Sequence, residues 1–137
     1  MVISRILHLK ELVIMNNNIN VLALAYIGDS VYEVYVRNYL IQSGLSKVDK
    51  LQKEAIKYVS AKSQSKFVMY LIENNMLNDD EIDVYMRARN HKSGRHPKNT
   101  DIITYKHSTG FEAIIGYLYL NNNFARIDEI FKFILEV

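Results

Sequence analysis

Two nearly apolar stretches of this chain each contain a carboxylate, and these acids constrain the fold more than any other feature. Residues 21–36 are almost all apolar or aromatic, yet Asp29 lies in the middle of them. Residues 111–120 contain a single charged side chain, Glu112. Because a carboxylate is strongly disfavoured away from water, each acid must be paired, solvated or given a cation.

Glycines stand close to both acids in the sequence. Gly28 precedes Asp29, and Gly116 lies one helical turn after Glu112. A glycine inside a helix costs roughly 1 kcal/mol relative to alanine, so it needs a reason, such as close approach of another helix or a ligand. The pattern predicts two closely packed helices that direct both acids into one cleft, where carboxylate oxygens suit Mg²⁺.

The alternative is that both acids are ordinary polar residues. Asp29, Glu33 and Arg37 recur at every fourth position, so they can form a stripe that faces water. Glu33 and Arg37 are also well oriented for a surface ion pair. Glu112 can pair with Lys106 or with an arginine instead of a metal ion. The pattern alone leaves both interpretations open.

Capping and helix-breaking residues divide the chain into helices. Gly44 follows the first helix as a left-handed cap, and residues 46–49 and 78–81 have the pattern of a capping box at a helix start. Sustained period-two alternation, which would indicate strands, is weak. The sequence therefore predicts an all-α helical bundle. The expected helices are residues 19–42, 46–59, 61–74, 78–90, 103–120 and 124–136.

Basic residues are concentrated in one segment, although the whole chain has a formal net charge of only +2. Residues 87–106 carry +5, which leaves −3 for the rest. A basic patch on an acidic body favours a polyanionic partner, and the alternative is a solvated loop. His91, His96 and His107 have no metal-ligand spacing, and we expect them to be loop residues. The candidate phosphate-binding residues are Arg87, Arg89, Lys92, Arg95, Lys98 and Lys106.

Length and composition narrow the setting. The absence of cysteine excludes disulfides and thiolate metal sites, and it fits a reducing cytoplasm. No apolar run is long enough for a membrane span, and residues 1–15 do not read as a signal peptide. The 137 residues suit one domain. We expect that domain at residues 19–137, after an N-terminal extension at residues 1–18, with Met15 as an alternative start.

Four segments resemble motifs of the ribonuclease III family, in the small form called Mini-ribonuclease III. Residues 22–33, LALAYIGDSVYE, resemble the signature helix of that family, and residues 108–118 resemble its second acidic motif. Residues 87–101 resemble its basic loop, and residues 59–64 also match. The motifs occur in the family's order and span almost the whole domain.

The resemblance implies a fold, a reaction and a substrate. It implies an all-helical ribonuclease III endonuclease domain that forms a homodimer through its signature helices, without a separate domain for binding double-stranded RNA. It implies Mg²⁺-dependent hydrolysis of double-stranded RNA to 5′-phosphate and 3′-hydroxyl ends, with Mn²⁺ as a substitute ion. The implied substrate is precursor 23S ribosomal RNA, and a large-subunit ribosomal protein is a candidate helper.

The same resemblance assigns roles to residues and leaves gaps. Asp29 and Glu112 match two of the four carboxylates of full-length ribonuclease III enzymes, and they are the expected catalytic and metal-binding residues. The other two positions fall on Ala25 and Thr109, so the number of metal ions is open. One alternative is a catalytically silent RNA-binding helical dimer of the same fold. Another is a structural dimer that binds a protein through tyrosine-rich faces.

Overall fold

The computed structural model of the chain describes residues 19–92, 98 and 100–137. Over these residues it contains helices and no strands, so the predicted all-α class is confirmed. No helix in these ranges is both long and apolar enough to cross a membrane. The helices are α2 (Val21–Gln42), α3 (Val48–Val59), α4 (Ala61–Glu73), α5 (Asp79–Arg89), α6 (Ile102–Leu120) and α7 (Phe124–Leu135).

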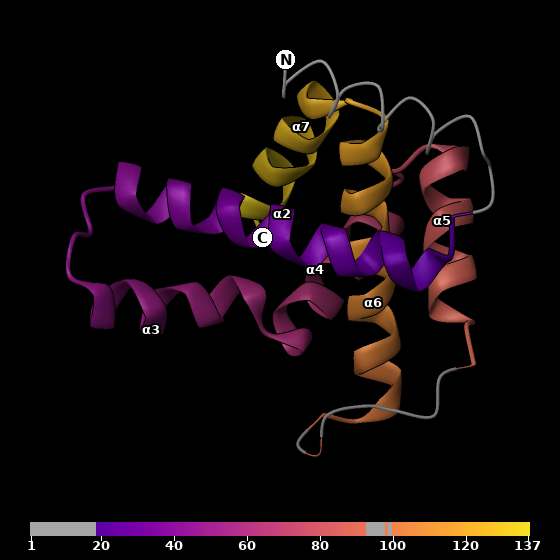
Figure 1. The fold of residues 1–137 in the computed structure, drawn as a ribbon, viewed down its shortest axis with the longest axis horizontal. Coiled ribbons are helices and arrows are strands. Elements are labelled where there is room, and N and C mark those ends of the chain that lie inside the picture. Colours follow the sequence, from indigo (N-terminus) through magenta and orange to yellow (C-terminus); the bar gives the residue numbers. More distant parts are fainter. Residues whose placement is uncertain (1–18, 93–97, 99) are drawn as a thin grey trace, which may run out of the picture.

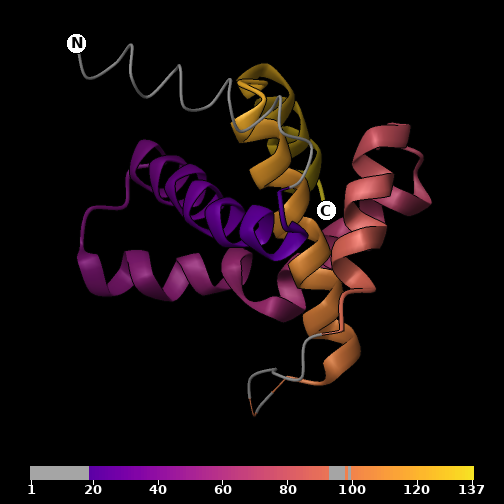
Figure 2. The same ribbon diagram turned by 45° about the vertical axis from the view of Figure 1, so that its right-hand side comes forward.

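Helix α6 is the centre of the bundle, because it contacts α2, α4, α5 and α7. In Figure 1, α6 runs vertically with α5 beside it, and α2 crosses it. Figures 1 and 2 agree that α2 and α3 run side by side as an arm that projects from the other helices. Large buried side chains from α2, α4, α6 and α7 fill the core, among them Tyr32, Phe67, Leu71, Phe111, Ile115 and Ile130.

Helices α2 and α6 approach so closely that glycine is required at two positions. A Cβ atom on Gly28 would lie 1.8 Å from the carbonyl oxygen of Glu112. A Cβ atom on Gly116 would lie 1.9 Å from the carbonyl oxygen of Leu24. Both distances are far shorter than any real contact, and both obstacles are backbone atoms that cannot rotate away. The predicted close packing of the two acid-bearing helices is therefore confirmed. Each glycine is needed because the backbone of the other helix lies against it.

Most predicted helix ends are also found. Gly44 has a φ of 104° after α2, as a left-handed cap does. Asn78 and Glu81 form a complete capping box at the start of α5. The asparagine run after α6 turns the chain, with Asn122 at a φ of 57° and Asn123 as the N-cap of α7.

The expected capping box at residues 46–49 is wrong. Helix α3 begins at Val48, and its N-cap is Lys47, whose side chain makes no capping hydrogen bond. Because the helix begins later than expected, Ser46 precedes the N-cap, and the Ser46–Asp49 spacing no longer matches the N-cap and N3 positions.

Candidate active site

The crossing of α2 and α6 places Asp29 and Glu112 at one site. Asp29 is exposed and directly follows Gly28, the residue that touches the backbone of Glu112. Glu112 is partly buried, and its pKa is raised from 4.5 to about 8. Burial is the main cause, followed by the negative charge of Asp29 and a hydrogen bond between the two side chains. The two carboxylates therefore lie close enough for the charge of Asp29 to affect Glu112.

The site has a deficit of positive charge. Over the described residues, neither Asp29 nor Glu112 forms an ion pair, so Lys106 and the described arginines do not neutralise Glu112. The described part of the chain also holds no group of three or more acids, histidines or cysteines that could bind a metal. Two carboxylates with no cation between them are the arrangement that a divalent ion relieves.

Two small, buried residues occupy the positions where full-length ribonuclease III enzymes have their other two carboxylates. Ala25 is 6% exposed and packs in the α2–α6–α5 cluster, and Thr109 is 8% exposed. The Thr109 hydroxyl donates to the carbonyl oxygen of Tyr105, one turn earlier in α6, at 3.0 Å. Neither side chain carries a charged oxygen, so neither position could supply an anionic ligand to an ion at this crossing.

A different buried acid shows how this chain neutralises a structural carboxylate. Glu81 is completely buried, and Arg126 of α7 donates to both of its oxygens at 2.8 Å. The same guanidinium donates to the carbonyl oxygen of Met76 at 2.6 Å. The sequence gives no sign of this pair, because the position of Glu81 is already explained as the N3 residue of a capping box. Glu112 has no such cationic partner in the described residues, so its charge is not compensated in this way.

The candidate phosphate-binding residues lie near the loop that joins α5 and α6. Arg87 is exposed but pairs with Asp83 at 3.0 Å. Lys92 and Lys98 are exposed, and Arg95 lies outside the described residues. Arg89 and Lys106 line a shallow cavity of about 210 Å³ at the loop end of α6. The described members therefore gather at one end of the molecule.

His107 corrects one expectation, because it lies inside α6 and not in the loop. Its ring stacks on that of Tyr85 with an interplanar angle of 10°, and its Nδ1 atom hydrogen-bonds to the Tyr85 hydroxyl. Burial, together with the charge of Arg89, lowers the pKa of His107. Its role in this position is therefore to pack α5 against α6. His96 lies outside the described residues.

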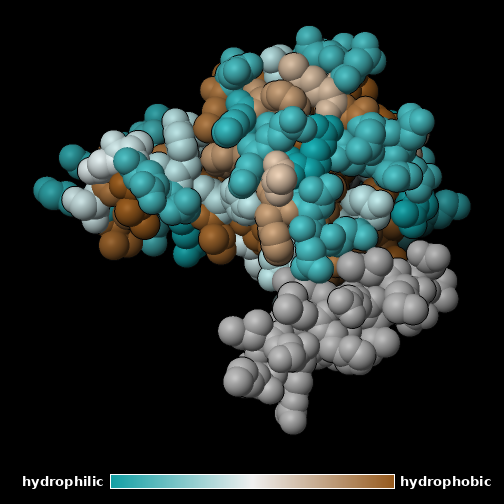
Figure 3. Space-filling view, turned by 90° about the horizontal axis from the view of Figure 1, so that it is seen from above, coloured by the Kyte–Doolittle hydropathy of each residue, from teal (hydrophilic) through white to brown (hydrophobic). Residues whose placement is uncertain are grey.

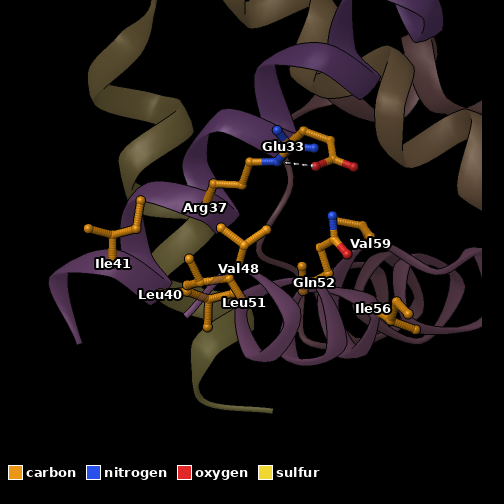
Figure 4. Close-up of a pocket in the computed structure, with 10 residues that line it drawn as sticks. Glu33, Arg37, Leu40, Ile41, Val48, Leu51, Gln52, Ile56 and Val59 are labelled. Atoms are coloured by element: carbon orange, nitrogen blue, oxygen red, sulfur yellow. Dashed lines mark hydrogen bonds and ion pairs between the residues drawn. The ribbon is translucent and has the colours of Figure 1, made fainter. Parts of the chain in front are cut away.

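A second hollow lies away from the acids, on the arm that α2 and α3 form. This groove has a volume of about 390 Å³, and apolar side chains such as Leu40, Ile41 and Ile56 line most of it (Figure 4). The ion pair between Glu33 and Arg37 lies at its edge, with a distance of 3.0 Å. This pair confirms the local surface interaction expected from the spacing, but it leaves Asp29 out.

Comparison with known proteins decides the family. Residues 22–123 match the ribonuclease III domain family. The chain belongs to the ribonuclease III family. It is 42% identical to Mini-ribonuclease 3 of Streptococcus pneumoniae over 88% of this chain and 94% of that protein. It is 47% identical to Mini-ribonuclease 3 of Brevibacillus brevis over 88% of this chain and 89% of that protein.

A solved structure supports the same assignment. A crystal structure of a protein from Fusobacterium nucleatum superposes with a TM-score of 0.79 at 30% identity, covering 88% of this chain and 96% of that one. The predicted ribonuclease III fold and the predicted activity, endonucleolytic cleavage of double-stranded RNA, are confirmed by family membership. Ribonuclease III enzymes depend on a divalent metal ion.

Proposed function

We propose that Asp29 and Glu112 bind Mg²⁺ and that the chain uses it to cut double-stranded RNA to 5′-phosphate and 3′-hydroxyl ends. The observation that carries this proposal is the α2–α6 crossing, which sets two interacting carboxylates side by side without a cationic partner in the described residues. Oxygen ligands from one or two acids, completed by water and substrate phosphate, are the usual donor set for Mg²⁺. The residues present therefore fit this ion.

Each residue of the site has a defined task in this reaction. A bound Mg²⁺ supplies Lewis-acid polarisation of the scissile phosphate and a more acidic water. Both carboxylates act as ligands in their ionised form, so binding of the ion must displace the proton that the raised pKa favours on Glu112. With only two protein carboxylates, water and RNA phosphate complete the ligand set.

The basic residues around the loop hold the RNA backbone. Arg89, Lys92, Lys98 and Lys106 are the described members that carry no ion pair, and Arg87 and Arg95 complete the predicted set. Contacts of cations with phosphates give affinity that falls with salt, and they carry little information about base sequence. Duplex RNA hides its base edges in a deep narrow groove, so recognition by shape suits this set.

The apolar groove between α2 and α3 supports a homodimer. Ile41, Val48 and Ile56 lie at or beside it and are each more than half exposed, and so is Val34 on α2. Figure 3 shows apolar surface on this projecting arm, at the left of the view. Exposed apolar side chains gathered on one part of a molecule are typical of interfaces, and a two-fold axis lets the same surface cover itself. The proposed dimer places two acid pairs on one RNA.

The proposed substrate is precursor 23S ribosomal RNA in the cytoplasm, with a large-subunit ribosomal protein as a candidate helper. The motifs at residues 22–33 and 108–118 support it through their resemblance to Mini-ribonuclease III. Paired ends of such a precursor are duplex RNA, which is the substrate class of the family.

The deciding experiment is a cleavage assay on a labelled RNA duplex, run with Mg²⁺ and with EDTA. The proposal expects cuts in both strands with Mg²⁺, ends that a 5′-phosphate-dependent exonuclease can degrade, and no cuts with EDTA. A catalytically silent RNA-binding dimer would instead retard the duplex on a gel and leave it intact under both conditions.

A further inference from the structure

Gln64 is a buried polar residue beside the acid pair to which the mechanism above gives no task. It is the fourth residue of α4 and is only 1% exposed. It also ends the segment of residues 59–64 that resembles the family without carrying an acid. A glutamine buried this deeply must use its hydrogen-bonding groups or lose stability.

The amide nitrogen of Gln64 connects two parts of the structure. Nε2 donates to the carbonyl oxygen of Val59, the last residue of α3, at 3.1 Å. It also donates to Oε2 of Glu112 at 3.4 Å. The amide oxygen is buried and finds no hydrogen-bond partner among the residues that the structure describes. An apolar side chain of similar size would avoid that cost, so the nitrogen's two contacts are the reason to have glutamine here.

The carbonyl that holds Gln64 belongs to a firmly fixed junction between α3 and α4. The Tyr32 hydroxyl, one turn after Asp29 on α2, donates to the carbonyl oxygen of Tyr58 at 2.9 Å. The Ser60 hydroxyl is separate from this contact, because it caps α4 by accepting a hydrogen bond from the backbone N–H of Ser63 at 3.2 Å. Through Tyr32, the helix that carries Asp29 therefore also helps to hold the segment that positions the Gln64 donor.

We propose that Gln64 is a positioning residue, which holds the Glu112 carboxylate in the orientation that binds the divalent ion. The inference rests on the proposed metal role of Glu112. A glutamate side chain has three rotatable bonds, and a fixed N–H donor on one oxygen limits the rotation of the carboxylate. Partners that orient metal ligands in this way typically change metal affinity by roughly 10-fold to 100-fold when they are removed.

The test compares Gln64→Met with Ser60→Ala. Methionine keeps the length of the side chain and removes the donor, whereas Ser60→Ala removes the α4 cap in the same segment and leaves the contact with Glu112. Mn²⁺ affinity is measured by calorimetry on the full-length protein without RNA. We expect roughly tenfold weaker binding for Gln64→Met and unchanged binding for Ser60→Ala.

A cleavage readout separates positioning from general damage. For Gln64→Met, the Mg²⁺ concentration that gives half-maximal cleavage should rise by a similar factor, while KM for the duplex at saturating Mg²⁺ stays unchanged. Circular dichroism checks the fold. Should Gln64→Met fail to fold, Gln64→Asn replaces it, because the shorter amide keeps the core polar and cannot span both contacts.

The outcomes are distinct from those that test the proposed function. Wild-type Mn²⁺ affinity in folded Gln64→Met or Gln64→Asn would overturn the positioning role and leave the nuclease proposal standing. An equal loss of affinity in Ser60→Ala would also overturn it, because the effect would then follow from the stability of α4. If the unaltered protein neither binds Mn²⁺ nor cuts RNA, the proposed metal site itself fails.

Discussion

The backbone of Gly28 lies against the carbonyl group of Glu112, with no space for even one methyl group between α2 and α6. A Cβ atom there would lie 1.8 Å from the carbonyl oxygen. Because Asp29 follows Gly28 directly, this contact sets the separation of the two carboxylates. The glycine that allows the helices to pack is thus also the residue that brings the two acids together.

Gly28→Ala should therefore destabilise the protein strongly. The methyl group meets backbone atoms on α6, so the helices must move apart, and we expect a loss of about 3 kcal/mol or more in the free energy of unfolding. Urea denaturation followed by circular dichroism measures this. Ser30→Ala, at an exposed position of the same helix, is the matched control and should change stability by less than about 0.5 kcal/mol. A Gly28→Ala protein as stable as the control would contradict the close crossing.

Removing one charge from the acid pair should stop cleavage without preventing RNA binding. Asp29→Asn keeps the size of the side chain and removes a metal ligand, so we expect the cleavage rate to fall by a factor on the order of 100 or more. Gel retardation with Ca²⁺ in place of Mg²⁺ should show duplex binding close to that of the unaltered protein. Glu33→Gln, one turn further along α2 in the surface ion pair with Arg37, is the control and should keep its activity. Full activity of Asp29→Asn would exclude the metal assignment.

A feature of this site can be predicted from sequence when its cause lies within one segment, and not when it depends on how distant helices pack. Gly28 and Gly116 are unfavourable residues inside predicted helices, so their local sequence is enough to indicate that another group packs closely against them. Glu81 gives no such signal, because its local pattern is already explained by the capping box, and its partner Arg126 lies on α7. Gln64 resembles a surface residue in sequence. Its burial depends on how α3, α4 and α6 meet, which no single segment specifies.

The raised pKa of Glu112 makes the stability of the metal-free protein depend on pH. A carboxyl whose pKa moves from 4.5 to about 8 on folding binds more protons in the folded state than in the unfolded state between these values. Stability should therefore fall as pH rises from about 5 to about 8. Thermal unfolding in EDTA across this range measures it. The lowered pKa of His107 acts in the opposite direction, so the comparison is with Glu112→Gln, which keeps His107.

In that comparison, the Tm of the unaltered protein should fall relative to that of Glu112→Gln as the pH rises. Adding Mg²⁺ at pH 8 should raise the Tm of the unaltered protein more than that of the variant, because the ion binds the ionised carboxylate in the folded state. Parallel Tm curves for the two proteins would mean that Glu112 titrates normally.

If the groove on the α2–α3 arm is the dimer interface, one charged side chain introduced there should weaken the dimer. Ile41 is 58% exposed in the single chain, so Ile41→Asp should leave the folded monomer intact. In a dimer the new carboxylate would be buried without a partner, at a cost of about 3 kcal/mol, which corresponds to roughly 100-fold weaker association. Light scattering at several protein concentrations measures this. Asn74→Asp adds the same charge at the exposed end of α4 and should not change the mass. A monomeric unaltered protein would refute the proposed interface.

The exposed lysines beside the α5–α6 loop should control affinity for RNA in a salt-dependent way. Lys92→Gln with Lys98→Gln removes two cations, so binding to duplexes of different sequence should weaken alike, and the slope of log affinity against log salt should decrease by about 2. Fluorescence anisotropy from 50 to 200 mM salt (about the range over which such contacts respond) measures both effects. Lys132→Gln on α7, far along the chain from the loop, is the control for a general loss of charge. A loss limited to one RNA sequence would show that these lysines read bases and not phosphates.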